Sequence, residues 1–256
     1  MDELKISVVI NTYNASAHLA TVMDSLTKFD EIVVCDMHSS DNTIDIAKGY
    51  GCRIVYQEKM SFVEPARNFA IQAASHNWVF VVDADEIVPD GLRDYLYNYI
   101  SEHPRCVGLH IPRCNYFMGR FMHAAYPDYI LRFFDRRVTT WPEQIHLQPK
   151  IEGIVGFIPS KRKDLAFIHL QSQSVSDFFS KTNLYSSAEI EKRKKGFKTI
   201  SFLYAPFVRF FKAYIIKGGF KDGVPGLIYA TTSAIYKFMT LAKLYEAKQG
   251  ENSATH

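Results

Sequence analysis

Cysteine is scarce in this sequence, and its spacing fits no paired site. The four cysteines are Cys35, Cys52, Cys106 and Cys114. None belongs to a Cys-x-x-Cys pair, and no Cys/His spacing fits a zinc site. Cys35 lies inside an apolar, strand-like run, where we expect it in the core. We therefore expect reduced thiols in a cytosolic setting.

Long apolar runs and a strong charge bias are also missing. No run of about 18 uninterrupted apolar residues occurs, so no transmembrane helix is predicted. Residues 1–5 lead directly into a short strand-like run, and we expect no signal peptide. The net charge of +3 is small and no basic low-complexity arm is present, so nothing here indicates nucleic-acid binding.

The glycine-rich loops that usually hold phosphates are absent. No Gly-x-Gly-x-x-Gly follows the first expected strand, and no Gly-x-x-x-x-Gly-Lys-Ser/Thr occurs anywhere. The usual dinucleotide and P-loop phosphate sites are therefore excluded. A nucleotide bound by this chain would be held by side chains and a metal instead.

What is present is the composition of a folded domain and an alternating pattern of elements. The apolar fraction is 47% and the charged fraction 22% over 256 residues, which suits a well-buried globular protein. Along the first hundred residues, strand-like and helical runs alternate, which predicts an α/β fold with a mostly parallel central sheet flanked by helices. We expect strands at 5–10, 31–35, 53–56 and 78–83, and helices at 17–29, 43–50, 63–74 and 89–101.

Carboxylates follow the most apolar of these runs. Trp78 to Val82 form an unbroken apolar strand, and Asp83, Asp85 and Glu86 come directly after it. A strand buried on both faces delivers its end to the carboxyl edge of the sheet, where α/β proteins bind ligands. Residues two apart on an extended chain point the same way. Asp83 and Asp85 thus suit Mg²⁺ or Mn²⁺ and, through the metal, a diphosphate. The alternative is a solvated acidic turn at a strand end.

The expected secondary structure changes after residue 107, and the composition changes after residue 197. From residue 107, short strand-like pieces are expected at 107–111, 129–134, 154–158 and 166–169, followed by a helix over 175–193. Residues 197–246 are dense in aromatic and basic residues, with breaks at Gly218-Gly219 and 222–226 that predict two amphipathic helices. This mixture suits contact with an anionic membrane surface. The alternative is a helix pair packed through its aromatics, with the lysines in water.

Several motifs together resemble a known family. Ile-Ser-Val-Val-Ile-Asn-Thr-Tyr-Asn (6–14), Asp-Glu-Ile-Val-Val-Cys-Asp (30–36), Ala-Arg-Asn (66–68) and Val-Val-Asp-Ala-Asp-Glu (81–86) resemble family 2 glycosyltransferases of the GT-A fold. Later pieces resemble a narrower branch, the bacterial lipopolysaccharide-core β-glucosyltransferases. They include Arg113 to Tyr116, Leu131 to Phe134, Trp141 to His146, Phe167 to Leu170 and Tyr214 to Gly226.

The resemblance implies a domain organisation and a reaction. It implies a glycosyltransferase domain over 1–196, with a nucleotide-sugar half at 1–100 and an acceptor-side half at 101–196, followed by a helical segment at 197–256. The expected reaction is inverting, metal-dependent transfer from a nucleotide-diphospho-sugar, such as a UDP-sugar, to a lipopolysaccharide, lipid-linked or polysaccharide hydroxyl. The expected location is the cytoplasmic face of the membrane, with peripheral contact through 197–246.

The resemblance also assigns the metal and its neighbours. Asp85 is the expected main ligand of Mg²⁺ or Mn²⁺, and Asp83 is expected to hold the ribose or a metal-bound water. His169, at the end of a late strand, resembles a third ligand of many such enzymes. Its alternative role is that of a half-buried histidine hydrogen-bonded at a strand end.

The nucleoside of the donor is expected near the first two strand ends. The resemblance places it against Thr12, Tyr13 and Asp36, where Asp36 could accept the N3–H of a uracil and Tyr13 could stack on the ring. A turn carboxylate is the alternative role of Asp36. Arg67 is expected to contact the base or a phosphate through its guanidinium, and its alternative is a surface arginine.

The general base departs from the family pattern. An inverting reaction needs a base near the acceptor hydroxyl, and the resembling branch has His-Glu where this chain has His146-Leu147. Glu143 or His146 could take the role, and Asp128 is a further candidate. The alternative function is a catalytically impaired nucleotide-sugar-binding protein. A nucleotidyltransferase fits less well, because Asn11 to Asn14 lack the glycine-rich basic loop of that class.

Overall fold

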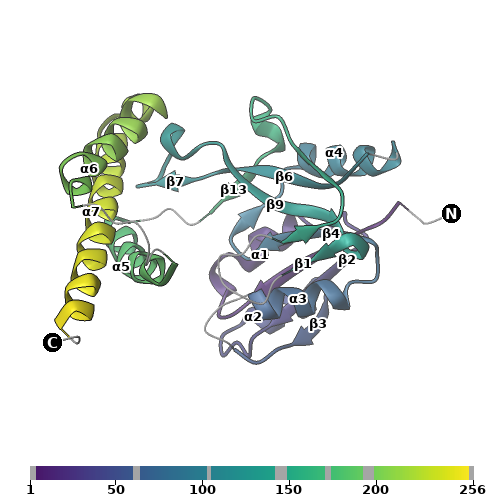
Figure 1. Ribbon diagram of the computed structural model, residues 1–256. Helices are drawn as coiled ribbons and strands as arrows, with labels where there is room; N and C mark the ends of the chain where they lie inside the picture. The colour runs from purple at the N-terminus through teal and green to yellow at the C-terminus, as the bar shows by residue number, and fades with distance from the viewer. Residues whose placement is uncertain are drawn as a thin grey trace. The chain divides into compact units, whose positions relative to one another are not determined.

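The chain folds into two compact units. The computed structural model describes residues 4–59, 64–102, 105–141, 149–170, 174–192 and 199–253 (Figure 1). The first unit comprises Met1–Cys114 and Pro127–Leu170, and the second comprises Asn115–Tyr126 and Gln171–His256. This division differs from the expected boundary after residue 196, because residues 115–126 and the helix that begins at Val175 group with the C-terminal helices.

The first unit is built on one large sheet. Among the described residues it has nine strands, in the order β3-β2-β1-β4-β9-β6-β13-β5, with β12 paired to β6. The strands are β1 (Ile6–Thr12), β2 (Glu31–Asp36), β3 (Arg53–Tyr56), β4 (Trp78–Asp83), β5 (Glu86–Ile87), β6 (Cys106–Cys114), β9 (Asp128–Asp135), β12 (Ile154–Phe157) and β13 (Phe167–His169). Five of the eight strand pairs described for this sheet are parallel and three are antiparallel.

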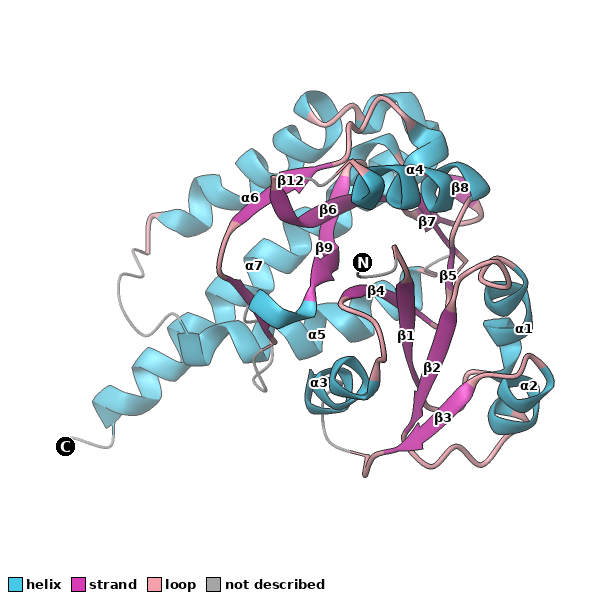
Figure 2. Cartoon of the chain, turned by 90° about the vertical axis from the view of Figure 1, so that its right-hand side faces the viewer, coloured by secondary structure: helices cyan, strands magenta, loops and turns pink. Residues whose placement is uncertain are grey.

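The four N-terminal strands form the parallel, doubly covered half of the sheet. Successive residues of β1 point to opposite faces: Val8 packs with α1 (Ser16–Asp24), and Val9 packs with α3 (Glu64–Ala73). The helices α1 and α2 (Thr43–Gly49) lie on one face and α3 on the other (Figure 2). Burial on both faces explains the unbroken apolar runs that predicted these strands.

The second half of the sheet is where antiparallel pairing enters. The strand β9 lies between β4 and β6 and is antiparallel to both. Aromatic side chains fill the core at this junction: Trp78 stacks on Phe133 with ring centroids 4.9 Å apart, and Phe80 stacks on Phe167 at 5.4 Å. The remaining elements of the unit are α4 (Asp90–Ser101), the small ladder β10 (Thr139–Thr140) with β11 (Lys150–Ile151), and the 3₁₀ turns η2 (Arg136–Val138) and η3 (Lys163–Leu165).

The second unit is mainly helical. It contains the hairpin β7 (Tyr116–Phe117) and β8 (Arg120–Phe121), the 3₁₀ turns η1 (His123–Ala125) and η5 (Gly219–Asp222), the π-helical turn η4 (Lys212–Ile216), and the helices α5 (Val175–Lys192), α6 (Ser201–Phe211) and α7 (Gly223–Ser253). The predicted breaks fall at η5 and at the start of α7. None of the described helices is both long and apolar enough to cross a membrane.

Two features hold the turn between α6 and α7 in place. A Cβ added to Gly226 would lie 1.9 Å from the carbonyl oxygen of Gly219, so only glycine allows this close approach. The buried Asp222 carboxylate accepts hydrogen bonds from the backbone N–H groups of His123 (3.0 Å) and Ala124 (3.1 Å) and contacts the His123 ring at 2.6 Å. The turn is thereby fixed to η1.

Candidate active site

The ends of β1, β2 and β4 bring the predicted site residues together. In the parallel register, Thr12 of β1 is opposite Asp36 of β2, and Asn11 of β1 is opposite Asp83 of β4. All these strands end at the same edge of the sheet. The topology therefore brings Asp36 and Asp83, which are 47 residues apart in the chain, to one edge of the sheet.

Asp36 closes the turn after β2. Its carboxylate is fully buried and accepts hydrogen bonds from the Thr12 hydroxyl (2.8 Å), the Ser39 hydroxyl (2.6 Å) and the Ser39 backbone N–H (2.8 Å). Tyr13 is exposed beside this turn, and the Lys59 ammonium lies 3.6 Å from the centre of its ring. These contacts fit the turn role of Asp36, and its contact with a nucleoside stays a prediction.

Asp83 is held between two arginines. Arg67 of α3 donates to Oδ1 at 2.8 Å, and Arg132 of β9 donates to Oδ2. Burial of Asp83 favours the neutral acid, but the charges of Arg132 and Arg67, aided by Arg113 and His169, outweigh it and lower the carboxyl pKa to about 2. Asp83 is therefore ionised, and each of its oxygens already accepts a hydrogen bond.

A second group of charged residues, next to Asp83, consists of Glu86, Arg113 and Asp128. Glu86 is fully buried, and one of its oxygens accepts a hydrogen bond from the Asp83 backbone N–H at 3.1 Å. The other accepts from Arg113 at 2.9 Å, and Arg113 also donates to Asp128 at 2.7 and 3.1 Å. Burial and the charge of Asp83 raise the pKa of Glu86, although Arg132 and Arg113 oppose this. The turn after β4 is thus fixed by Glu86.

Asp85 has a different environment from its acidic neighbours. Its Oδ2 lies 3.1 Å from Nε2 of His169, and its backbone carbonyl accepts a hydrogen bond from the Leu170 N–H at 2.8 Å. The antiparallel pairing of β5 with β13 puts His169 opposite Glu86 and so explains this meeting across 84 residues. Within the described part of the chain, no arginine contacts the Asp85 carboxylate.

The Asp85 and His169 pair fits a divalent cation. Carboxylate oxygen and imidazole nitrogen are ligands that Mn²⁺ accepts, and Mg²⁺ accepts the carboxylate. Neighbouring ligands of an octahedral ion at about 2.1 Å lie about 3 Å apart, close to the 3.1 Å separation of the two atoms. Among the described residues, no group of three or more histidine, cysteine and acidic side chains could hold a metal ion.

Similarity to known proteins identifies the family of this chain. Residues 7–150, more than half of the chain, match the family model described as glycosyl transferase family 2. The chain belongs to glycosyl transferase family 2. It is therefore a glycosyltransferase, and inversion of the anomeric centre is typical of this family.

Two relatives of this glycosyltransferase align over almost their whole length. The lipopolysaccharide core biosynthesis glycosyltransferase LpsC of Rhizobium meliloti is 27% identical, over 95% of this chain and 93% of that protein. The uncharacterized glycosyltransferase RT0209 of Rickettsia typhi is 25% identical, over 94% of this chain and 87% of that protein. The likeness to LpsC agrees with the predicted resemblance to lipopolysaccharide-core enzymes.

A solved structure supports the GT-A fold of this glycosyltransferase. The mannosyltransferase PcManGT of Pyrobaculum calidifontis, solved in complex with GDP-Man and Mn²⁺, superposes with a TM-score of 0.58. The match covers 94% of this chain and 87% of that one, at 15% identity. At this identity the likeness shows the fold alone.

The predicted general bases are not all placed. Glu143 and His146 lie outside the described residues, so their role in this glycosyltransferase stays a prediction. Trp141, the last described residue before them, is buried, and the Arg67 guanidinium lies 5.2 Å from its ring. Asp128, the third candidate, is part of the Arg113 ion pair, with two hydrogen bonds to one of its oxygens.

Sequence reasoning missed three residues of this cluster. Arg132, Arg113 and Glu86 complete the ion pairs around Asp83 and Asp128. The signal for Arg132 was present, because it interrupts the apolar run Leu131 to Phe134, and a buried arginine requires an ionised partner. The partner itself could not be predicted, since Asp83 is 49 residues away and belongs to another strand.

Proposed function

We propose that this protein transfers a sugar from a nucleotide-diphospho-sugar, in particular a UDP-sugar, to a hydroxyl of a lipopolysaccharide, lipid-linked or polysaccharide acceptor. The observation that carries the proposal is the contrast within one acidic turn. Asp83 and Glu86 are each paired with arginine, whereas Asp85 faces only His169 among the described residues. Asp85 is thus the carboxylate whose negative charge can bind a cation.

The proposed metal is Mg²⁺ or Mn²⁺, held by Asp85 and His169. When bound, the cation would neutralise the charge that develops on the diphosphate leaving group. The chain's own residues prepare this position. Arg67 and Arg132 keep Asp83 ionised and hold its carboxylate, and the Leu170 N–H donates a hydrogen bond to the backbone carbonyl of Asp85. The ligand pair is therefore positioned before the donor arrives, which limits the ordering cost of binding.

The donor nucleoside is proposed to lie at the edge formed by Thr12, Tyr13 and Asp36, with Arg67 beside the base or phosphate. Tyr13 offers an exposed ring on which a base can stack, and the Lys59 ammonium next to it can contact an anion. Asp83 is proposed to hold the ribose or a metal-bound water through its remaining lone pairs, because each of its oxygens accepts only one hydrogen bond among the described residues.

The acceptor half of the reaction needs a general base. Glu143 or His146 would remove the proton of the attacking hydroxyl, so that it attacks opposite the leaving group. The similarity to LpsC supports a lipopolysaccharide-type acceptor. Such an acceptor is anchored in a membrane, and we place the protein at its cytoplasmic face, in peripheral contact through residues 197–246.

The experiment is a donor screen by thermal shift, with and without Mn²⁺. A UDP-sugar with Mn²⁺ should raise the melting temperature of the wild type by several degrees, as tight ligands do by mass action. Asp85→Ala should lose the metal-dependent part of the shift. Asp94→Ala, which removes an exposed carboxylate from α4, is the matched control and should keep it. A metal-dependent shift in melting temperature that is unchanged in Asp85→Ala would contradict the metal role of Asp85.

A transfer assay separates the enzyme from the alternative of a nucleotide-sugar-binding protein. The enzyme should release UDP from its donor in the presence of acceptor, and Glu143→Gln or His146→Ala should slow this release at least 100-fold without changing the thermal shift. Donor binding with no turnover on any acceptor, and no effect of either variant, would favour the binding protein.

A further inference from the structure

The outward face of α6 and η4 is strongly apolar. Leu203, Phe207 and Ile216 are 74%, 73% and 70% exposed, and Val208 and Phe211 are more than half exposed. The opposite side packs on α7, where Phe202 contacts Phe238 with ring centroids 5.6 Å apart. Single exposed apolar residues are ordinary, but a continuous row of this kind marks a surface that binds something apolar.

Cations that have no partner among the described residues lie along α6 and η4. Arg209 and Lys212 are exposed, and neither forms a hydrogen bond or an ion pair within the described part of the chain. Lys217 and Lys221 follow at the next turns. The acidic residue nearest in sequence, Asp222, is buried and contacts His123. Among the described residues, no acidic side chain therefore pairs with the cations of this face.

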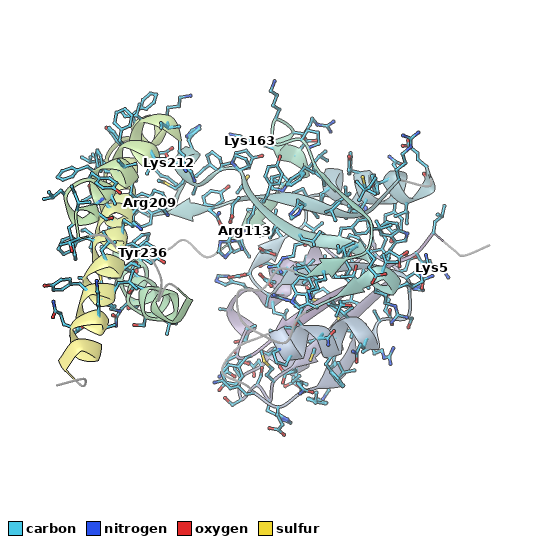
Figure 3. The ribbon with its side chains drawn as sticks, viewed as in Figure 1. Lys5, Arg113, Lys163, Arg209, Lys212 and Tyr236 are labelled. Atoms are coloured by element: carbon cyan, nitrogen blue, oxygen red, sulfur yellow. The ribbon has the colours of Figure 1, made fainter. Side chains whose placement is uncertain are left out.

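Two of these cations line a groove between α6 and α7. The groove has a volume of about 270 Å³ and is lined on the α6 side by Tyr204, Val208, Arg209 and Lys212, and on the α7 side by Tyr236 and Lys237. Figure 3 labels Arg209, Lys212 and Tyr236 along these helices. A water molecule occupies about 30 Å³ in the liquid, so the groove has room for a phosphate group and the atoms attached to it.

We propose that this groove binds the phosphate of an anionic phospholipid headgroup, while the α6 face inserts its apolar side chains at the level of the acyl chains. The inference rests on the proposed membrane contact and names the residues and the lipid chemistry for it. The guanidinium of Arg209 and the ammonium of Lys212 supply charge-assisted donors for phosphate oxygens. The Tyr204 and Tyr236 side chains place aromatic rings with polar ends at the same rim, as is common at membrane interfaces.

A lipid fits this groove better than a free anion does. A site for soluble phosphate needs hydrogen-bond donors but no exposed apolar border. On α6, by contrast, the exposed Arg209 lies among exposed apolar side chains, those of Phe207, Val208 and Phe211. Basic residues placed among bulky apolar ones on one helix face are typical of helices that lie in the membrane interface. The combination therefore selects a headgroup that is attached to acyl chains.

The test is cosedimentation of the full chain with vesicles of phosphatidylcholine alone or with 30 mol% phosphatidylglycerol, at low salt. Each cation near an anionic surface contributes about 1 kcal/mol, so Arg209→Gln/Lys212→Gln should weaken binding to the anionic vesicles about 30-fold. Lys48→Gln/Lys161→Gln removes the same charge from exposed sites of the first unit and should change binding less than threefold. Phe207→Ser/Phe211→Ser should weaken binding to both kinds of vesicle.

Four results would overturn the groove, each for a separate reason. Equal losses in Lys217→Gln/Lys221→Gln and in the groove variant would mean diffuse attraction without a headgroup site. Inorganic phosphate or glycerol phosphate that stabilises the protein as strongly as the vesicles do would mean a site for a soluble anion. Concentration-dependent dimerisation that Phe207→Ser/Phe211→Ser abolishes would mean that a second copy covers α6. Wild-type protein that ignores all vesicles would remove the proposed membrane contact itself, with sugar transfer unaffected.

Discussion

Replacing Asp83 with asparagine tests the charge balance of the site. The substitution keeps the size of the side chain and removes its negative charge, so that Arg67 and Arg132, which are 11% and 8% exposed, face an amide. The pKa of Asp83 falls from 3.8 to about 2, which corresponds to about 2 kcal/mol of stability at pH 7. Removing one partner of a buried ion pair costs about 3–5 kcal/mol in other proteins. We therefore expect a loss of about 2–4 kcal/mol.

The loss of stability in Asp83→Asn should depend on pH in a defined direction. Because the folded state lowers the pKa of Asp83, the stabilisation is complete above pH 5 and is lost as the pH falls through the folded pKa. The difference in unfolding free energy between wild type and Asp83→Asn should therefore shrink to about half its neutral value near pH 3.

Urea unfolding followed by tryptophan fluorescence is the suitable assay. The chain has two tryptophans, Trp78 and Trp141, and both belong to the first unit. Asp164→Asn, which removes an exposed carboxylate paired with Arg162, is the control and should leave the unfolding midpoint unchanged. A wild-type midpoint in Asp83→Asn at pH 7, or a difference that grows as the pH falls, would refute the view that the two arginines need this carboxylate.

The remaining predictions concern the helix turn and the thiols. Gly226→Ala should destabilise the second unit by at least about 2 kcal/mol, because the new Cβ would lie 1.9 Å from the Gly219 carbonyl oxygen. The control is Gly49→Ala, because Gly49 has open space around it. Limited proteolysis of the segment before α7 should be faster in Gly226→Ala than in the control. Burial, with the charge of Asp36, raises the pKa of the Cys35 thiol to about 11. Cys35 should therefore react with iodoacetamide at pH 8 at least about 100-fold more slowly in the folded protein than in urea, and rapid labelling mapped to Cys35 would contradict its burial.

The order of elements could be predicted from local patterns, whereas the pairing of the later strands could not. The run Trp78 to Asp83 was predicted with its observed bounds, because burial on both faces leaves a purely apolar signature. The antiparallel insertion of β9 between β4 and β6 depends on contacts between distant segments. Helix ends were less certain: α1 ends at Asp24, five residues before the expected end, and Leu26 and Phe29 reach the core from the following turns.

For the site, the sequence predicted which side chains are acidic or basic, but it did not predict which of them form hydrogen bonds and ion pairs with one another. The two aspartates of the turn look equivalent in sequence, yet Asp83 meets Arg67 and Arg132 while Asp85 meets His169. The family resemblance had brought Asp85 and His169 together, and the pairing of β5 with β13 explains why they meet. The arginines that distinguish the two aspartates arrive from α3 and β9, so no local pattern around residue 83 could identify them.

Binding of Mn²⁺ tests the central claim most directly. The electron paramagnetic resonance signal of free Mn²⁺ decreases when the ion is bound, so a titration with protein and UDP measures the dissociation constant without any acceptor. We expect Asp85→Ala and His169→Ala each to weaken Mn²⁺ binding at least about tenfold, a change of about 1.4 kcal/mol or more, and Asp94→Ala to bind Mn²⁺ like the wild type. Wild-type affinity in both site variants would contradict a metal centre at Asp85 and His169.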